Sequence, residues 1–218
     1  DAEKAKAKEE AQAKAKEATD AINKQPDVAT TPTAAKTAQD AVDAAKAKGV
    51  ADVKAVNPVA KEAAKQAIAD ELAKKVGEID ARPDLTDKEK DAAKKDAQAK
   101  AKKATDAINA QPDNAETPEK AAEAQTAVDG AKDKGVADVK AVNPVAKEKA
   151  KEEIAKELAK KEEAIDARPD LTDEEKAAAK KDAQAKAKEA TDAIDAQPSI
   201  AETPEKAAEA QKAVDGAK

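Results

Sequence analysis

The sequence predicts an all-α protein of tandem three-helix bundles, stacked end to end into an elongated rod, and three observations support this prediction. Ala, Lys and Glu, which favour helices, are among the commonest residues. Aromatic residues are absent and large β-branched residues are scarce, which disfavours β-structure. The sequence also repeats itself every 86 residues without an insertion or a deletion, which is typical of repeat proteins.

The copies of the repeat are nearly identical. Aligning residues 57–132 with residues 143–218 gives 14 differences in 76 positions. We therefore predict a partial repeat at 1–56 that contains the second and third helices, a full three-helix repeat at 57–142, and a nearly complete three-helix repeat at 143–218. An alternative frame, in which residues 58–79 complete the bundle of residues 1–56, stays open at this stage.

Capping residues and prolines predict where the three helices of a repeat begin and end. The first helix should begin at Asn57-Pro58, with Asn as the cap and Pro in the first turn, and should end before Arg82-Pro83. The second should begin with the capping box Thr86–Glu89 and end before Gln111-Pro112. The third should begin at Thr117-Pro118, which again combines a cap and a proline.

Gly135 leaves two possibilities for the third helix. It could end the helix in a left-handed conformation, or the helix could continue to Val142, because Val128, Gly135, Val139 and Val142 share one face. We favour the continuous helix. Only Asn143 would then precede the next helix, which is too short for a hairpin loop, so the two helices should continue with a kink at the proline. An odd number of helices per repeat predicts a rod.

The missing amino acids exclude several functions. The 218 residues include no Cys, His, Met or aromatic residue. Thiolate nucleophiles, imidazole bases, disulfides and the usual zinc sites are therefore excluded, as are stacking platforms for single-stranded nucleic acid and aromatic anchors for tight interfaces. We expect no enzymatic activity, no catalytic, cofactor-binding or metal-binding residues, no cofactor, and a monomeric chain.

Charge and hydropathy exclude two classes of partner. The chain has 41 basic and 47 acidic residues and a net charge of −6, whereas a nucleic-acid-binding domain should be basic. No run of 18 apolar residues exists, so we expect no insertion into a membrane. Opposite charges spaced four residues apart, such as Asp96/Lys100 and Glu71/Lys75, indicate solvated helix faces rather than catalytic carboxylates.

Two local features leave alternatives. The acidic residues Asp80, Asp84 and Asp87 could bind calcium, but their spacing is not that of an EF-hand. We favour turn and capping roles for Asp84 and Thr86 in this loop, with Arg82 paired to a nearby acid or to a helix carbonyl. Ile200 occupies the position of Asn114 in the preceding copy and should be either exposed or tucked under the loop between the second and third helices.

Several segments resemble the alanine-rich helical repeats of Gram-positive cell-wall-anchored surface proteins, which include giant staphylococcal extracellular-matrix-binding proteins and related streptococcal and lactobacillar adhesins. The most specific is Pro-Asp-Leu-Thr-Asp-Glu-Glu-Lys at 169–176, together with Asn143-Pro144 at the repeat boundary. The resemblance covers essentially the whole chain. It implies helical bundles in an extracellular stalk at the bacterial surface, anchored through parts outside residues 1–218, and it implies no catalytic residues.

Two functions follow as hypotheses. The repeats could be a spacer that holds an adhesive region away from the cell wall, since near-identical units add length rather than new chemistry. Alternatively, a helical face could bind a host protein such as fibronectin, albumin or an immunoglobulin, with repetition providing avidity. The segment 94–102, which is identical to 180–188, is a candidate face. The lack of aromatic residues argues against binding.

Overall fold

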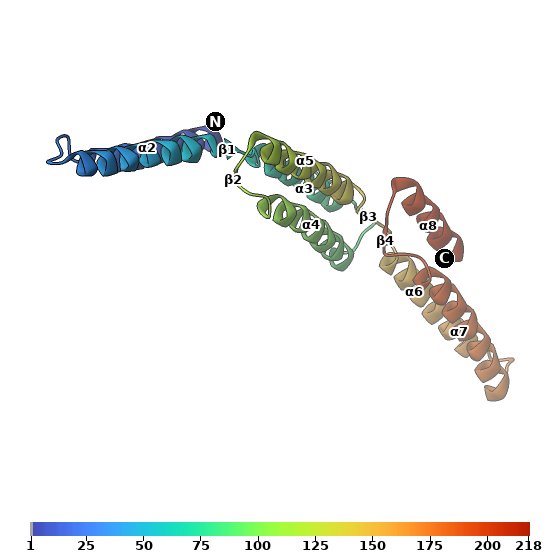
Figure 1. Ribbon diagram of the computed structural model, residues 1–218. Coiled ribbons are helices and arrows are strands. Elements are labelled where there is room, and N and C mark those ends of the chain that lie inside the picture. Colours follow the sequence, from blue (N-terminus) through green and yellow to red (C-terminus); the bar gives the residue numbers. More distant parts are fainter. Residues whose placement is uncertain (1) are drawn as a thin grey trace. The chain divides into compact units, whose positions relative to one another are not determined.

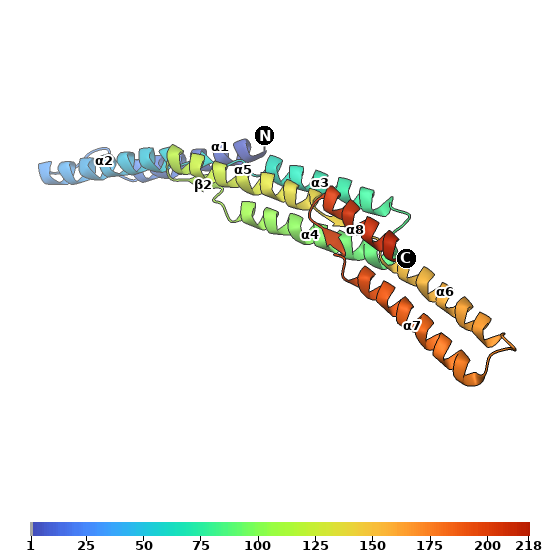
Figure 2. The same ribbon diagram turned by 90° about the vertical axis from the view of Figure 1, so that its right-hand side faces the viewer.

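The computed structural model describes residues 2–218, and it confirms the all-α fold and the 86-residue tandem repeat. Within these residues the chain forms eight helices (Figures 1 and 2): α1 (Ala2–Asn23), α2 (Pro32–Lys54), α3 (Glu62–Asp80), α4 (Asp87–Asn109), α5 (Pro118–Lys140), α6 (Glu148–Asp166), α7 (Asp173–Asp195) and α8 (Pro204–Ala217). Four strands of two residues each lie between them: β1 (Asn57–Pro58), β2 (Asn114–Ala115), β3 (Asn143–Pro144) and β4 (Ile200–Ala201).

The short strands join the start of each repeat to a loop of the same repeat. β1 pairs with β2 and β3 pairs with β4, both antiparallel, so that Asn143 lies opposite Ala201 and Pro144 opposite Ile200. The N–H of Val145 extends the second ribbon by donating to the carbonyl of Ser199 at 3.0 Å. The residues around each Asn-Pro pair are therefore held in extended pairing.

The predicted start of the first helix is wrong. The helix begins at Glu62 in one repeat and at Glu148 in the next, not at Asn57-Pro58 or its copy. The Asn143 amide donates instead to the carbonyl of Ala201, in the strand opposite, at 3.4 Å. Pairing with the strand opposite keeps the Asn-Pro pair extended, and the conformation that proline imposes on its predecessor favours the same result.

The third helix continues through Gly135, as we favoured, but it ends at Lys140 and does not reach Val142. The expected helix kinked at a proline is therefore wrong. An extended linker, residues 141–147, connects α5 to α6, and an equivalent linker at 55–61 connects α2 to α3. These two linkers, and not a continuous helix, join successive repeats.

The predicted capping signals of the second and third helices are confirmed. Thr172 caps α7 in a capping box with Glu175, and Thr203 caps α8, which has Pro204 in its first turn. The side chain of Thr31 caps α2 in the same way. These local signals act as predicted because each involves groups within one turn of helix.

The chain divides into two compact units, one made of the residues up to Ala67 with 103–134, and the other of 68–102 with 135–218. In the second unit, α6 and α7 lie side by side (Figures 1 and 2), and residues of α8 join them in one apolar cluster. Its buried members are Val145, Ala150, Ile194, Ala210 and Val214. Alanines and a few large aliphatic residues therefore share this core.

In the first unit, α1 and α2 form an antiparallel pair along their length. Gly49 is buried where the helices approach, and a Cβ atom at this position would overlap the Cβ of Ala18. Val53 of this pair is 36% exposed, whereas Val139, one repeat later, is fully buried. The α1–α2 pair therefore leaves exposed a position that is covered in the following repeat.

Candidate functional site: the repeat junction

The loop before α4 carries the acidic residues singled out in the sequence. The guanidinium of Arg82 donates to both carboxylate oxygens of Asp84, at 2.7 and 2.5 Å, which confirms the expected pairing. This pairing lowers the pKa of Asp84 below its ordinary value, against the effect of partial burial, and raises the pKa of Arg82. Asp80 instead binds the ammonium of Lys94, 3.0 Å away on α4. Asp84 and Asp80 thus each have a cationic partner within the protein.

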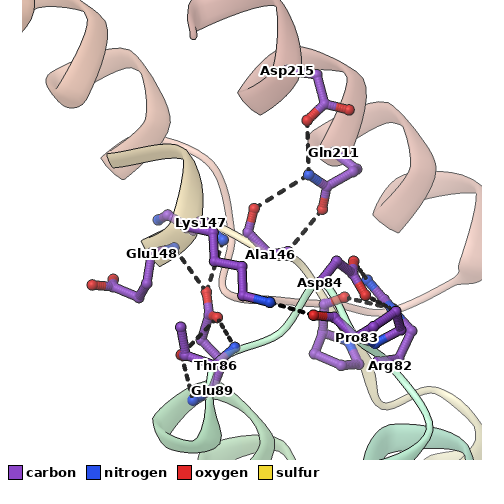
Figure 3. Close-up of polar contacts among 12 residues, drawn as sticks. Arg82, Pro83, Asp84, Thr86, Glu89, Ala146, Lys147, Glu148, Gln211 and Asp215 are labelled. Atoms are coloured by element: carbon purple, nitrogen blue, oxygen red, sulfur yellow. Dashed lines mark hydrogen bonds and ion pairs between the residues drawn. The ribbon is translucent and has the colours of Figure 1, made fainter. Parts of the chain in front are cut away.

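Glu89 connects two helices through its two carboxylate oxygens (Figure 3). Oε2 accepts the backbone N–H of Thr86 at 2.8 Å, which completes the predicted capping box of α4. Oε1 accepts the backbone N–H groups of Lys147 and Glu148, at 2.7 and 3.1 Å, at the first turn of α6. One side chain therefore caps its own helix and the first helix of the next repeat.

This second cap replaces a local one. Lys147 occupies the N-cap position of α6, and its own side chain makes no capping hydrogen bond. The first N–H groups of a helix have no intrahelical partner, and they carry the positive end of the helix dipole. The Glu89 carboxylate, supplied by the preceding repeat, accepts hydrogen bonds from these N–H groups and places a negative charge at the positive end of the α6 dipole.

The protonation state of Glu89 follows from these contacts. Burial raises the pKa of its carboxyl. Hydrogen bonds from the backbone N–H groups of Thr86, Lys147 and Glu148 lower the pKa, and their combined effect is larger than that of burial, so the pKa lies below its ordinary value. The ionised form is therefore favoured at neutral pH, and an anion is the form that binds two helix N-termini.

Gln211 of α8 holds the linker from the other side (Figure 3). Its amide oxygen accepts the N–H of Ala146 at 2.9 Å, and its amide nitrogen donates to the carbonyl of Ala146 at 3.2 Å. Asp215 accepts a further hydrogen bond from the same nitrogen at 3.2 Å, which fixes the orientation of the amide. The side chain thus pairs with the linker as a neighbouring strand would.

Lys147 carries its charge into the interior of the repeat. The residue is only 7% exposed, and its ammonium donates to the carbonyls of Asp195 and Gln197, at 3.0 and 2.7 Å. These carbonyls lie at the C-terminal end of α7, where unpaired acceptors and the negative end of the helix dipole favour a cation. Lys147 therefore joins the start of α6 to the end of α7.

An apolar cluster completes the junction between α4 and the next repeat. Leu85 and Ile79 are almost fully buried and cluster with Val142 of the linker and with three alanines: Ala93, Ala97 and Ala146. Ile200 is half-buried and packs against this cluster from the next repeat. It is thus covered at a junction, rather than exposed or tucked under its own loop.

The hydrogen bonds of the glutamate and the glutamine recur 86 residues earlier, within the first unit. Glu3 Oε1 accepts the N–H groups of Lys61 and Glu62, at 2.6 and 3.1 Å. Gln125 accepts from and donates to the backbone of Ala60, at 2.8 and 3.1 Å. Lys61, which is 6% exposed, donates to Gln111 O and to Asp113, the latter at 2.7 Å. The junction is therefore a repeated structural device.

The position of Asn114 and Ile200 differs in polarity between the two junctions. Asn114 stands where Ile200 stands in the next repeat, and its amide nitrogen donates to Glu10. Its amide oxygen is buried and has no hydrogen-bond partner among the described residues. One junction therefore places a polar side chain where the other places an apolar one.

Sequence reasoning missed most of this site. It assigned Glu89 to a capping box, and it assigned no role to Gln211 or to Lys147. A signal existed in the repeat itself, because Glu3, Glu89 and Glu175 are identical, as are the residues at the Gln211 and Lys147 positions. Residues that stay the same while their neighbours change indicate a shared contact, although they do not identify the partner.

Of the two ion pairs expected from i, i+4 spacing, one forms and the residues of the other have different partners. Asp96 and Lys100 pair as predicted, 3.0 Å apart. Lys75 pairs instead with Glu78 at 2.9 Å, and Glu71 lies 3.7 Å from Lys140. Helical spacing limits the possible partners of a charged side chain, and packing selects among them.

Across residues 2–218, the acidic side chains nowhere gather in a group of three that could hold a metal ion. In the same part of the chain, none of the helices has both the length and the apolar character needed to cross a lipid bilayer.

Comparisons with known proteins identify the repeat. The chain matches the family described as Domain of Unknown Function (DUF1542) twice, at residues 60–147 and 146–217. No curated protein and no solved structure was found to be similar. The two matches meet within the linker before α6, in agreement with the period of the sequence. Because they cover more than half of the chain, the protein belongs to the DUF1542 family, a repeat family of Gram-positive surface proteins.

Proposed function

We propose that this chain is a structural spacer of a bacterial surface protein, which projects a binding region away from the cell wall. The observation that carries the proposal is the junction, which occurs twice with the same contacts at the same spacing. Each junction fastens the linker by hydrogen bonds from both neighbouring repeats, so it favours a defined connection rather than a flexible one. Nearest-neighbour contacts of this kind let an array grow by identical steps.

The charged surface supports the same role. Many exposed lysines pair with acids one helical turn away, for example Lys36 with Asp40 and Lys188 with Asp192. Such pairs favour helix formation and place opposite charges side by side along the exposed helix faces. A non-catalytic role for a monomeric chain on the cell surface forms part of this proposal.

Binding of a host protein by a helical face is a weaker candidate. The face at 94–102 is identical to 180–188, but packing and ion pairing within the repeat already account for much of this identity. Ala97 and Ala101 are buried, and Lys94 and Lys100 have acidic partners within the protein. The segment therefore offers little beyond its structural role.

Small-angle X-ray scattering of chains with two, three and four repeats tests the spacer. We expect the maximum dimension to increase by a constant increment of roughly 35–40 Å per repeat, the length of a helix of about 24 residues. A compact array, whose maximum dimension stays nearly constant as repeats are added, would reject the proposal.

The same chains, immobilised and exposed to serum and matrix proteins, test the alternative, because saturable binding would support a host ligand.

A further inference from the structure

At the junction before α6, the surface around Leu85 is covered by the linker and by the following repeat. An equivalent surface lies between the end of α6 and the start of α7, and it is uncovered. Residues 165–190 differ from 79–104 at only three positions, 174, 177 and 189. The open copy includes Ile165, Arg168, Leu171, Ala179 and Ala183, which line a groove of about 510 Å³. We call these five residues the terminal groove.

The closed copy shows what such a groove accommodates. There, Val142 and Ala146 of the linker cluster with Leu85, and Ile200 of the following repeat packs against them. Arg82 donates to the carbonyl of Pro144 at 3.3 Å. Leu85 is 3% exposed as a result, whereas Leu171, its counterpart in the terminal groove, is only half-buried.

The polar residues around the groove are also in place. Glu175 forms the capping box of α7, with Oε2 accepting the N–H of Thr172 at 2.8 Å, as Glu89 does with Thr86. Arg168 and Asp170 form the same bidentate pair as Arg82 and Asp84. The surface is therefore already arranged as it is where a linker is bound.

From this match we infer that the terminal groove is a docking site for the linker of another repeat of the same type, continuing from α8. The Val and Ala of that linker, equivalent to Val142 and Ala146, would cover Leu171. The first N–H groups of the helix that follows the linker would bind Glu175 Oε1. A linker within a separate copy of this chain is a poor occupant, because Glu3 and Glu89 already bind both linkers. The inference rests on the proposed role of the chain as a repeat array.

A chain lengthened by one repeat provides the test. Lys218 aligns with Lys132, so residues 133–218 can be appended directly after Lys218 in the natural period. Hydrogen exchange of the segment 165–176, followed by mass spectrometry, reports on the groove. We expect exchange there to slow about tenfold or more in the lengthened chain, to the rate of the matching segment 79–90, which serves as the internal reference.

Two variants make the result specific. Leu171→Ala should speed exchange and lower the unfolding midpoint more in the lengthened chain than in the original, where the side chain is only half-buried. Glu175→Gln retains a residue that is compatible with a capping box but removes the charge. It should restore fast exchange at the first amides of the appended helix, while α7 remains folded in both chains.

Equal exchange of 165–176 in the two chains, with equal effects of Leu171→Ala, would overturn the inference. Concentration-dependent protection of the original chain would overturn it as well, because the groove would then bind a second copy. The scattering test is independent of this one. Slowed exchange without growth in maximum dimension would reject only the spacer, and growth without slowed exchange would reject only the docking.

Discussion

The carboxylate of Glu89 accepts the backbone N–H of Lys147 at 2.7 Å, across 58 residues of sequence. Glu3 makes the same contact with Lys61 at 2.6 Å, also across 58 residues. In both cases the acid begins the second helix of one repeat, and the amide begins the first helix of the next. The first helix of a repeat thus has its N-terminus capped by its neighbour, which couples the folding of adjacent repeats.

Replacing Glu89 with Ala should destabilise the protein by about 1–2 kcal/mol, after allowance for its partial exposure to solvent, because three backbone N–H groups lose a charged acceptor. Urea unfolding followed by circular dichroism measures the change. Glu175→Ala is the matched control, since it removes only the capping box of α7. A midpoint shift for Glu175→Ala as large as that for Glu89→Ala would show that the contact between repeats contributes nothing.

The contribution of Glu89 should disappear in acid. Its pKa is lowered in the folded protein, so the group stabilises the fold above the ordinary glutamate pKa of about 4.3, and this stabilisation is lost as the pH falls through the folded value. The difference in unfolding midpoint between the native protein and Glu89→Gln should therefore be largest near pH 7 and small near pH 3. A difference that stays constant over this range would contradict the assignment of an ionised Glu89.

Ile200→Asn, which introduces the residue of the preceding repeat, should destabilise the protein by about 1–3 kcal/mol. The substitution removes apolar contact with the cluster around Leu85 and places an amide against it. Val28→Asn is the control at the same repeat position, because Val28 is 85% exposed and should tolerate the change. Thermal melts of both variants test this, and equal midpoints would show that Ile200 is not packed at the junction.

Gly49→Ala should destabilise the α1–α2 pair by about 1–3 kcal/mol, although Ala favours helices over Gly, because the added methyl overlaps Ala18. Gly130→Ala should instead stabilise the protein by up to about 1 kcal/mol, since a Cβ atom at Gly130 meets no atom within 4 Å. Circular dichroism melts distinguish the two signs. A stabilising Gly49→Ala would mean that α1 and α2 lie further apart than described.

Ile194→Ala should be among the most damaging single substitutions, at about 2–5 kcal/mol, because the side chain is fully buried at the centre of the α6–α8 cluster. Ile22, its counterpart in α1, is only half-buried, so Ile22→Ala should cost clearly less. Urea titrations of both variants supply the comparison. Equal losses would imply that the α1–α2 pair is as completely covered as the third repeat.

Several features of this protein follow from its sequence alone. The helical class, the 86-residue period, and the caps at Thr172 and Thr203 all depend on residues close together in the chain, or on direct comparison of one copy with another. At Gly135 the sequence favoured a continuous helix but left a helix end possible. Local hydrogen bonds and backbone preferences decide these features, and such preferences can be recognised without knowing the tertiary contacts.

Only the tertiary structure decided how one repeat is joined to the next. Asn143-Pro144 resembles a helix start, but pairing with Ile200 and Ala201 makes it a strand, and α6 takes its cap from Glu89, 58 residues away. Neither partner is adjacent in sequence, and a glutamate that already completes a capping box shows no sign of a second acceptor role. Contacts of this kind depend on which surfaces the fold brings together. The local sequence around a hydrogen-bond donor does not identify an acceptor that lies far away in the chain.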